Sequence, residues 1–141
     1  MKTIIPLHIR SIEEGNYHVF LRVKVGRYAS NLLLDTGASK TVFDHQAILR
    51  FIRDKEIKEY DSQSVGLGSS GIKTEVAVIK NLRFGELKLK EFEVAVLDLS
   101  HVNHTYKQIK IEPIDGVLGS DFLMKYQAVI NYKKAELQLW I

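Results

Sequence analysis

The stretch that most restricts the fold is YHVFLRVKVGRYASNLLLDTG, residues 17–37, in which apolar and polar residues first alternate and the chain then reverses. A period of two residues is typical of a strand with one buried face. Gly26 and Arg27 form the predicted turn, and NLLL returns as a second strand. This predicted hairpin delivers Asp35 at its far end. Its predicted buried face consists of Tyr17, Val19, Leu21, Val23 and Val25, and Phe20 is the exception to the alternation.

An aspartate directly after three leucines needs a physical explanation, because burying a carboxylate costs free energy unless the group is hydrogen-bonded or used. One explanation is an Asx-type turn that closes the strand, since Asp and Gly are common turn residues. The other is that Asp35 is a catalytic carboxylate. The tripeptide Asp35-Thr36-Gly37 alone does not separate the two explanations.

The rest of the chain predicts mainly strands and little helix. Residues 44–57 carry apolar residues at helical spacing, which predicts a short amphipathic helix with Asp44 as its N-cap. A second short helix is expected after Gly119, with Ser120 as its candidate cap. The polar stretch SHVNHTYKQ, residues 100–108, is interpreted as a loop.

One strand is expected to be irregular. The apolar residues of ELKLKEFEVAVLDL, residues 86–99, change phase at Lys90 and Glu91, which predicts a bulge or a sharp bend. The chain contains no linker, low-complexity tract or internal repeat. The sequence therefore predicts one all-β domain, residues 1–141, with one or two short helices.

Two motifs carry a resemblance to a known family. LLLDTGASKTVF, residues 32–43, and IDGVLGSDFL, residues 114–123, resemble the retropepsin-like aspartic proteases. The order is also similar over most of the chain: hairpin, D-T-G-A-S, glycine-rich flap, a second sheet segment, two apolar residues plus Gly, helix and final strands. The resemblance implies a single-domain acid-protease-like β barrel, half of a pepsin-like bilobe. It also implies an aspartic endopeptidase that needs no cofactor and acts on an extended polypeptide.

The number of D-T-G motifs restricts how such a site could work. Two carboxylates that share one proton can activate a water and supply a proton, as is known for aspartic proteases, because like charges about 3 Å apart cannot both ionise. The sequence holds one D-T-G and no D-S-G. The second carboxylate would therefore be Asp35 of another copy, across the two-fold axis of a homodimer.

The resemblance also implies roles for neighbouring residues. Thr36 would hydrogen-bond across the axis, and Gly37 would let the backbone pass close, with its N–H facing the carboxylate. Ala38 and Ser39 would begin the wall that faces the substrate. The flap, which in the family opens for the peptide and closes over it, would contain Gly66, Gly68, Ser69, Ser70 and Gly71, and the alternative is an ordinary hairpin turn.

Two residues near the second motif have structural interpretations. Gly119 follows two apolar residues where, in the family, the chain passes beside the active loop, so that a Cβ would collide there. The alternative is an ordinary turn before a helix. Asp115 precedes this segment and is interpreted as structural rather than catalytic.

Composition excludes or disfavours several other functions. The chain has no cysteine, which excludes disulfides, a thiolate nucleophile and zinc-cysteine sites. His101 and His104 form an H-x-x-H pair without a third ligand nearby in the sequence, so we expect a solvated loop and no metal site. The net charge of +3 comes from basic residues scattered among acidic ones, which disfavours nucleic-acid binding.

The sequence shows neither a membrane span nor a targeting signal. No apolar run approaches the roughly 18 residues that cross a bilayer. The first apolar stretch is short and is interrupted by Pro6 and His8, unlike the core of a signal peptide. A cytoplasmic protein is expected. Two alternatives to the enzyme remain: a catalytically silent peptide-binding domain of the same fold, and a structural domain in which D-T-G is only a turn.

Overall fold

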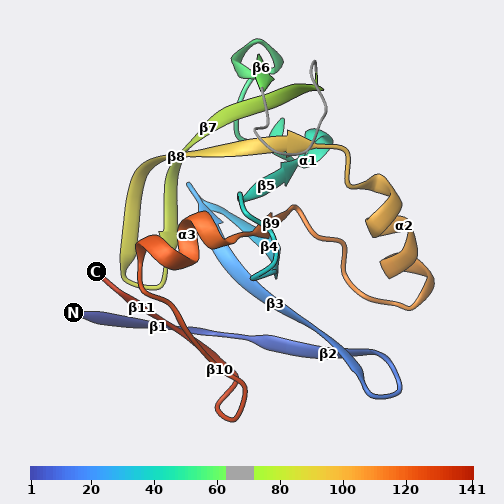
Figure 1. The fold of residues 1–141 in the computed structure, drawn as a ribbon, viewed down its shortest axis with the longest axis vertical. Helices are drawn as coiled ribbons and strands as arrows, with labels where there is room; N and C mark the ends of the chain where they lie inside the picture. The colour runs from blue at the N-terminus through green and yellow to red at the C-terminus, as the bar shows by residue number, and fades with distance from the viewer. Residues whose placement is uncertain (63–71) are drawn as a thin grey trace.

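The computed structural model describes residues 1–62 and 72–141, and its regular structure is mostly β with short helices at the margins (Figure 1). The helices are α1 (His45–Ile48), α2 (Ser100–Gln108), α3 (Ser120–Lys125) and the 3-10 helix η1 (Asp54–Glu56). The strands are β1 (Lys2–Pro6), β2 (His8–Glu13), β3 (Asn16–Val25), β4 (Tyr28–Leu34), β5 (Val42–Asp44), β6 (Lys58–Ser62), β7 (Ile72–Phe84), β8 (Leu87–Leu97), β9 (Gly116–Leu118), β10 (Val129–Asn131) and β11 (Glu136–Trp140).

The strands form two sheets. Eight of them pair in the order β2-β3-β4-β9-β5-β8-β7-β6, and an additional β3–β7 pairing closes the inner strands into a ring. Strands β4 and β9 are parallel, as are β5 and β8. The other sheet has the order β1-β11-β10 and brings the two ends of the chain together (Figure 1). The expectation of a single all-β barrel domain with few helices is confirmed.

The predicted hairpin is formed by β3 and β4, with Val25 opposite Tyr28 across the turn. Gly26 in this turn has a φ of 59°, a left-handed conformation that glycine adopts without steric cost. Tyr17 is exposed, contrary to expectation, and lies near the start of β3, outside the pairing of β3 with β4. The other residues of the predicted face are buried: Val19, Leu21, Val23 and Val25.

Phe20 breaks the alternation because the sheet has a hydrophobic cluster on each face. The main core contains Leu21 and Leu32, whereas Phe20 belongs to a second, smaller cluster. A strand between two clusters can bury consecutive residues. The second cluster consists of Phe20, Leu99, Tyr106, Ile111 and Ile114, with Ile12, Leu33, Val102 and Val117 packed against it.

The expected irregularity near Lys90 and Glu91 is a bend and not a bulge. The register of β7 against β8 runs without a shift from Glu75 opposite Val96 to Phe84 opposite Leu87. Figure 1 shows both strands turning sharply along their length. Asn81, on the partner strand, has a φ of 58°, so the local distortion is on β7.

The helix predicted for residues 44–57 is much shorter than expected. Asp44 is its N-cap, as predicted, because its Oδ2 accepts the Ala47 N–H at 3.1 Å. After Ile48, however, i→i−3 hydrogen bonds tighten the chain, including one of 2.9 Å from Phe51 N–H to the Ile48 carbonyl. The tighter turn directs Phe51 against the main core, so that the α-helix ends early.

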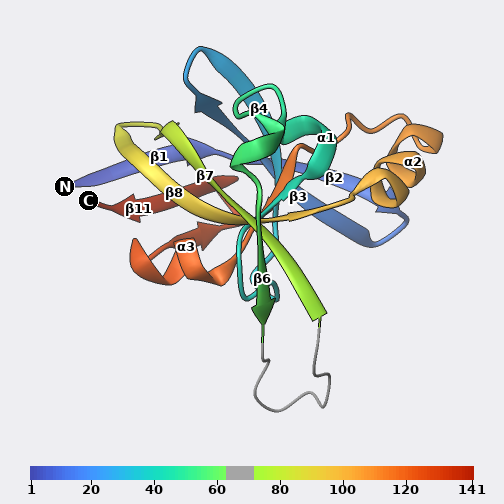
Figure 2. The ribbon, with the colours of Figure 1, turned by 90° about the horizontal axis from the view of Figure 1, so that it is seen from above.

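The predicted loop at residues 100–108 is instead helix α2. Leu99, Val102 and Tyr106 are spaced so that one helical face packs into the second cluster. Asp98 supports the first turn, since its Oδ1 accepts the Ser100 N–H at 2.9 Å. Hydrogen bonding from the Ser100 side chain, and then from its backbone N–H, lowers the pKa of Asp98. In both views α2 lies at the end of the molecule away from the chain termini (Figures 1 and 2).

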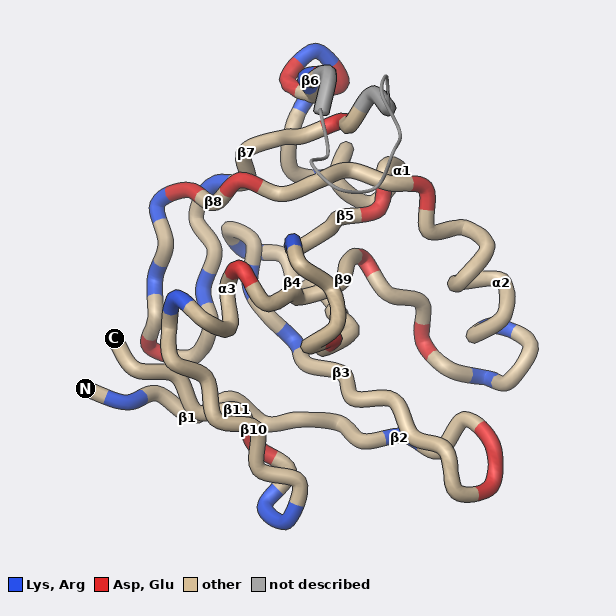
Figure 3. The backbone as a smooth tube through the Cα atoms, in the orientation of Figure 1, with Lys and Arg blue, Asp and Glu red and all other residues tan. Residues whose placement is uncertain are grey.

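Helix α3 follows the second motif as expected, but Gly119 occupies its N-cap position and Ser120 is its first residue. The Ser120 side chain therefore does not cap the helix. Acidic and basic residues are interspersed along the described backbone (Figure 3). Over the same residues, no helix is long and apolar enough to cross a membrane.

Candidate active site

Asp35 lies immediately after β4, at the start of the loop that leads to β5. Its N–H donates to the Leu118 carbonyl at 3.1 Å, which extends the parallel pairing of Leu34 with Leu118. Its Oδ1 accepts the Gly37 N–H at 2.9 Å, as the resemblance implied. The Asp35 side chain is exposed, so in the isolated chain it does not bear the desolvation cost considered from the sequence. The Asx-type turn is therefore present, and the same turn holds the carboxylate at the surface.

The active loop, residues 35–41, lies against the second motif. Ser120 N–H donates to the Ala38 carbonyl at 2.7 Å. A Cβ on Gly119 would lie 2.8 Å from the Ala38 carbonyl oxygen and equally close to the Lys40 backbone. Neither contact involves a flexible side chain that could move away. The prediction that Gly119 permits a close passage beside the active loop is confirmed.

A polar clamp that sequence reasoning missed fixes the end of the active loop. Thr41 is buried, and its backbone N–H and Oγ1 donate to one oxygen of Asp121 at 2.9 and 2.8 Å. The Gly119 N–H in turn donates to Thr41 Oγ1 at 3.1 Å. Thr41 and Asp121 lie inside the two motifs, but the sequence shows nothing that pairs residues 80 positions apart.

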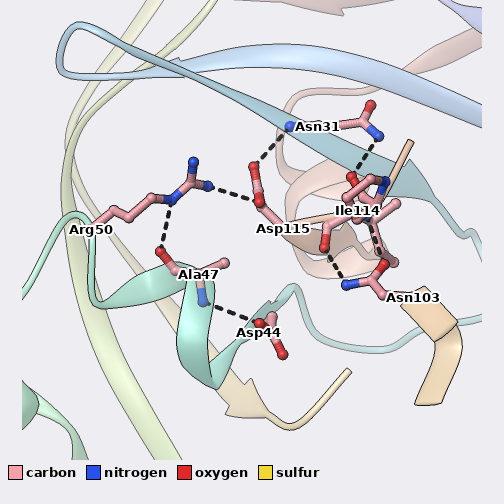
Figure 4. Close-up of polar contacts among 8 residues, drawn as sticks. Asn31, Asp44, Ala47, Arg50, Asn103, Ile114 and Asp115 are labelled. Carbon is pink, nitrogen blue, oxygen red and sulfur yellow. Dashed lines mark hydrogen bonds and ion pairs between the residues drawn. The ribbon is translucent and has the colours of Figure 1, made fainter. Parts of the chain in front are cut away.

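Asp115 joins three elements in a second network (Figure 4). Its Oδ2 accepts the Asn31 N–H of β4 at 3.2 Å, and its Oδ1 pairs with the guanidinium of Arg50 at 2.8 Å. The Asp115 carbonyl also accepts the Asp44 N–H at 2.8 Å. Both carboxylate oxygens therefore contact groups within the chain, which supports the structural interpretation of Asp115.

Helix α2 is tied to the same region through Asn103 (Figure 4). Its side chain donates to the Ile114 carbonyl at 2.9 Å and accepts the Ile114 N–H at 2.8 Å. Asn31 donates from its side chain to the Pro113 carbonyl at 3.1 Å. These bonds fasten the segment before β9 to α2 on one side and to β4 on the other.

The remaining predicted site residues are only partly placed. Thr36 and Ser39 are exposed and Ala38 is half-buried, all beside Asp35 on the active loop. The predicted flap residues Gly66, Gly68, Ser69, Ser70 and Gly71 lie outside the described residues. The strands on either side, β6 and β7, pair as an antiparallel hairpin that ends with Ser62 opposite Ile72.

A groove elsewhere in the molecule does not include Asp35. A groove of about 750 Å³ lies between α1 and α2, and its lining includes Gln46, Asn103 and Lys107 but not Asp35. It is therefore separate from the predicted catalytic carboxylate. Among residues 1–62 and 72–141, no three His, Asp or Glu side chains come together as metal ligands.

Comparisons with known proteins agree with this geometry. A family model described as aspartyl protease matches residues 21–122, which include the first motif, all but the last residue of the second motif, and most of the barrel. The chain belongs to the aspartyl protease family. No curated protein sequence matches this family member.

Two solved structures show that this aspartyl protease family member has a retropepsin-like fold. A retropepsin-like aspartic protease from Rickettsia conorii superposes with a TM-score of 0.59 at 15% identity, covering 99% of this chain and 90% of the other. The retroviral protease-like domain of Ddi1 from Leishmania major gives a TM-score of 0.52 at 15% identity, covering 81% of each chain. At this level of identity the similarity establishes the fold.

Proposed function

We propose that this protein is an aspartic endopeptidase that cleaves extended polypeptides as a homodimer. The observation that carries the proposal is the placement of Asp35, an exposed carboxylate on a loop held by hydrogen bonds to Gly37 and Leu118. Family membership supports the same chemistry. An exposed carboxylate at a fixed position can face its counterpart in a second copy, which a buried carboxylate could not do.

In the proposed dimer, two Asp35 side chains face each other across the two-fold axis and share one proton. The ionised carboxylate takes a proton from a water molecule, and the water oxygen attacks the scissile carbonyl carbon. The protonated carboxyl gives its proton to the carbonyl oxygen, which stabilises the charge that develops there. These two transfers give a tetrahedral diol. When its C–N bond breaks, the leaving amine takes the proton that came from the water, and a diol hydroxyl returns a proton to the other carboxylate. The two Asp35 carboxyl groups therefore again hold one proton.

Further residues have supporting roles in this proposal. Thr36, exposed next to Asp35, would bond to the partner's loop, and Ala38 and Ser39 would contact the bound peptide. The segment of residues 66–71 would act as the flap at the end of the β6–β7 hairpin. Thr41 and Asp121 would position the loop without touching the substrate.

The test compares wild-type protein with Asp35→Asn and with Asp54→Asn, an exposed aspartate on η1 that serves as the matched control. Each protein is incubated with an unstructured polypeptide, and new chain ends are counted by mass spectrometry. We expect Asp35→Asn to lose at least about 10²-fold in rate because the general base is removed. Its melting temperature and the rate of the control should match those of wild type.

Two outcomes would contradict the proposal. If Asp35→Asn cleaves at the wild-type rate, Asp35 is only a turn residue. If wild type and Asp35→Asn both bind peptides and neither cleaves them, the protein is the catalytically silent peptide-binding domain.

A further inference from the structure

A small pocket separate from the candidate active site lies between the β2–β3 hairpin and the chain segment before β9. Its volume is about 140 Å³, and neither Asp35 nor any other residue of the active loop lines it. At about 30 Å³ per water molecule, such a space holds a few waters or one small ionic group. The side chains around it therefore decide which group it accepts.

The strand register brings the basic side chains of this pocket to one sheet face. In the antiparallel pairing of β2 with β3, His8 lies opposite Phe20 and Arg10 lies opposite His18. Directly opposite residues point to the same face, as do residues two apart on one strand. Arg10 and Arg22 therefore approach the His8–Phe20 pair from its two ends, and both line the pocket.

Buried residues form the inner wall of the pocket. Phe20 and Ile111 line it and belong to the second cluster. Asn31 also lines it, is only 7% exposed, and donates from its side chain to the Pro113 carbonyl at 3.1 Å. Its N–H donates to Asp115 at 3.2 Å. A ligand would therefore meet a wall that is already held in place by packing and hydrogen bonds.

The positive charges of the pocket are only partly compensated. Arg22 pairs with Glu112, which also lines the pocket, and both side chains are about half-exposed. The Arg10 side chain has no ion pair or hydrogen bond with any described residue. Two guanidinium groups and one carboxylate leave a positive pocket even when His8 is neutral. The Arg22–Glu112 pair shows that a carboxylate fits beside a guanidinium here.

We propose that this pocket binds one oxyanion group, a carboxylate or a phosphate, between Arg10 and Arg22. Guanidinium groups donate pairs of hydrogen bonds that match the oxygens of such anions. The bound group uses the free donors of Arg10 and competes with Glu112 for those of Arg22. Both a free anion and an acidic peptide side chain supply such a group, and the test separates these sources. The inference does not depend on the proposed function.

The test titrates two probes separately into the isotope-labelled full chain and follows backbone amide signals by NMR. One probe is inorganic phosphate, and the other is an acetylated and amidated tripeptide with one central glutamate. Ionic strength is kept constant, because surface electrostatics change with salt. The pocket variants are Arg10→Gln, Arg22→Gln and Glu112→Gln.

Two control variants change the net charge by the same amounts outside the pocket. Arg27→Gln matches the two arginine variants, and Glu14→Gln matches Glu112→Gln. Both control residues are exposed, and neither lines the pocket. The melting temperature of every variant is compared with that of wild type, so that a loss of folding is not counted as a loss of binding.

We expect saturable binding of at least one probe, with signal changes centred on His8 and Arg10. Arg10→Gln should weaken binding by about tenfold, because charge-assisted hydrogen bonds are lost. Arg22→Gln should weaken it at least as much, since Glu112 is then left unpaired in the pocket. Glu112→Gln should strengthen binding by about threefold, because the internal competitor is removed. Misfolding cannot imitate this gain.

The outcomes either identify the ligand or overturn the inference. Tighter binding of phosphate indicates a free phosphate-type anion, and tighter binding of the tripeptide indicates an acidic side chain. The inference is overturned if neither probe saturates, or if Arg10→Gln and Arg22→Gln bind like wild type. It is also overturned if Arg27→Gln weakens binding as much as Arg10→Gln, because overall charge then accounts for the effect. A gain in Glu14→Gln equal to that in Glu112→Gln has the same meaning.

Discussion

The active loop and helix α2 are held in place by different forces. The active loop is fixed by backbone hydrogen bonds and by the clamp between Thr41 and Asp121. Helix α2 is fixed mainly by the packing of one apolar stripe, with Asn103 as its polar anchor. Directional bonds determine a geometry closely, whereas apolar packing accepts several side chains of similar size. The difference predicts that substitutions in the two regions change activity and stability in different proportions.

The largest combined effect on activity and stability is expected at the contact between the two motifs. Gly119→Ala places a Cβ against the Ala38 and Lys40 backbone, so the active loop must move or the helix start must shift. We expect a loss of about 3 kcal/mol in the free energy of unfolding and about 10²-fold in kcat/KM, because small misplacements of catalytic groups are costly. Denaturant unfolding and peptide cleavage measure the two losses.

Gly15→Ala is the matched control for that variant. Gly15 has a φ of 80°, and a Cβ added there would have no neighbouring atom within 4 Å. The substitution should cost about 1 kcal/mol through backbone strain and leave kcat/KM unchanged. Equal activity losses in both variants would show that the Gly119 contact is not specific to the active loop.

The second-largest effect on activity and stability is expected at the clamp between Thr41 and Asp121. Asp121→Ala leaves the buried Thr41 N–H without its acceptor, which should lower the free energy of unfolding by about 2–3 kcal/mol. Because the loop loses its anchor, kcat should fall by about tenfold or more, with a smaller change in KM. Asp54→Ala, at an exposed aspartate, should change neither quantity. A wild-type kcat in Asp121→Ala would mean that the active loop holds its geometry without the clamp.

Removing the hydrogen bonds of Asn103 in helix α2 should affect activity less than removing those of Asp121. Asn103→Ala removes both hydrogen bonds to Ile114, and we expect the free energy of unfolding to fall by about 1–2 kcal/mol. The kcat should remain within about threefold of wild type, because these bonds fasten the segment before β9 and not the active loop. A loss of kcat as large as that of Asp121→Ala would show that α2 and the active loop are not independent.

The smallest effect is expected from Tyr106→Phe and appears at high pH. The folded-state pKa of Tyr106 is raised above its ordinary value of 10.0, mainly by burial. The neutral phenol therefore stabilises the fold fully below pH 10, and this contribution is lost as the pH rises through the raised pKa. Removing the hydroxyl should reduce the loss of stability at alkaline pH, measured as the melting temperature across pH 8 to about 12. An unchanged pH dependence would contradict the burial of an ionisable phenol.

The contrast between the active loop and helix α2 also explains which features the sequence could predict. The β3–β4 hairpin, the turn at Asp35 and the close passage at Gly119 were predictable because each is marked by a local pattern: alternation, a turn tripeptide, or two apolar residues before a glycine. A Cβ added at Gly119 would collide with the backbone of the active loop, so that prediction is confirmed. Helix α2 was missed because Leu99, Val102 and Tyr106 are separated by histidine, asparagine and other polar residues, and their spacing gains meaning only beside the second face of the sheet.

Other features were hidden because they depend on distant partners. The α-helix predicted from residue 44 ends at Ile48, where Phe51 turns into the core and Arg50 reaches Asp115. The pairing of Thr41 with Asp121 is likewise a tertiary contact, although both residues lie within recognisable motifs. Local sequence carries little information about such contacts, because either residue could also satisfy its hydrogen bonds with water or with nearby backbone.

The most direct test of the account is subunit mixing, because the central claim is that two copies contribute Asp35 to one site. A fixed amount of wild-type protein is mixed with increasing Asp35→Asn at concentrations where native mass spectrometry shows exchanged dimers, and cleavage per wild-type chain is measured. Random pairing predicts that this activity falls to about half at equal amounts and to about a tenth at ninefold excess of the variant. Asp54→Asn should cause no decrease. Activity that stays constant at ninefold excess of Asp35→Asn would show that one chain carries a complete site and would contradict the shared pair.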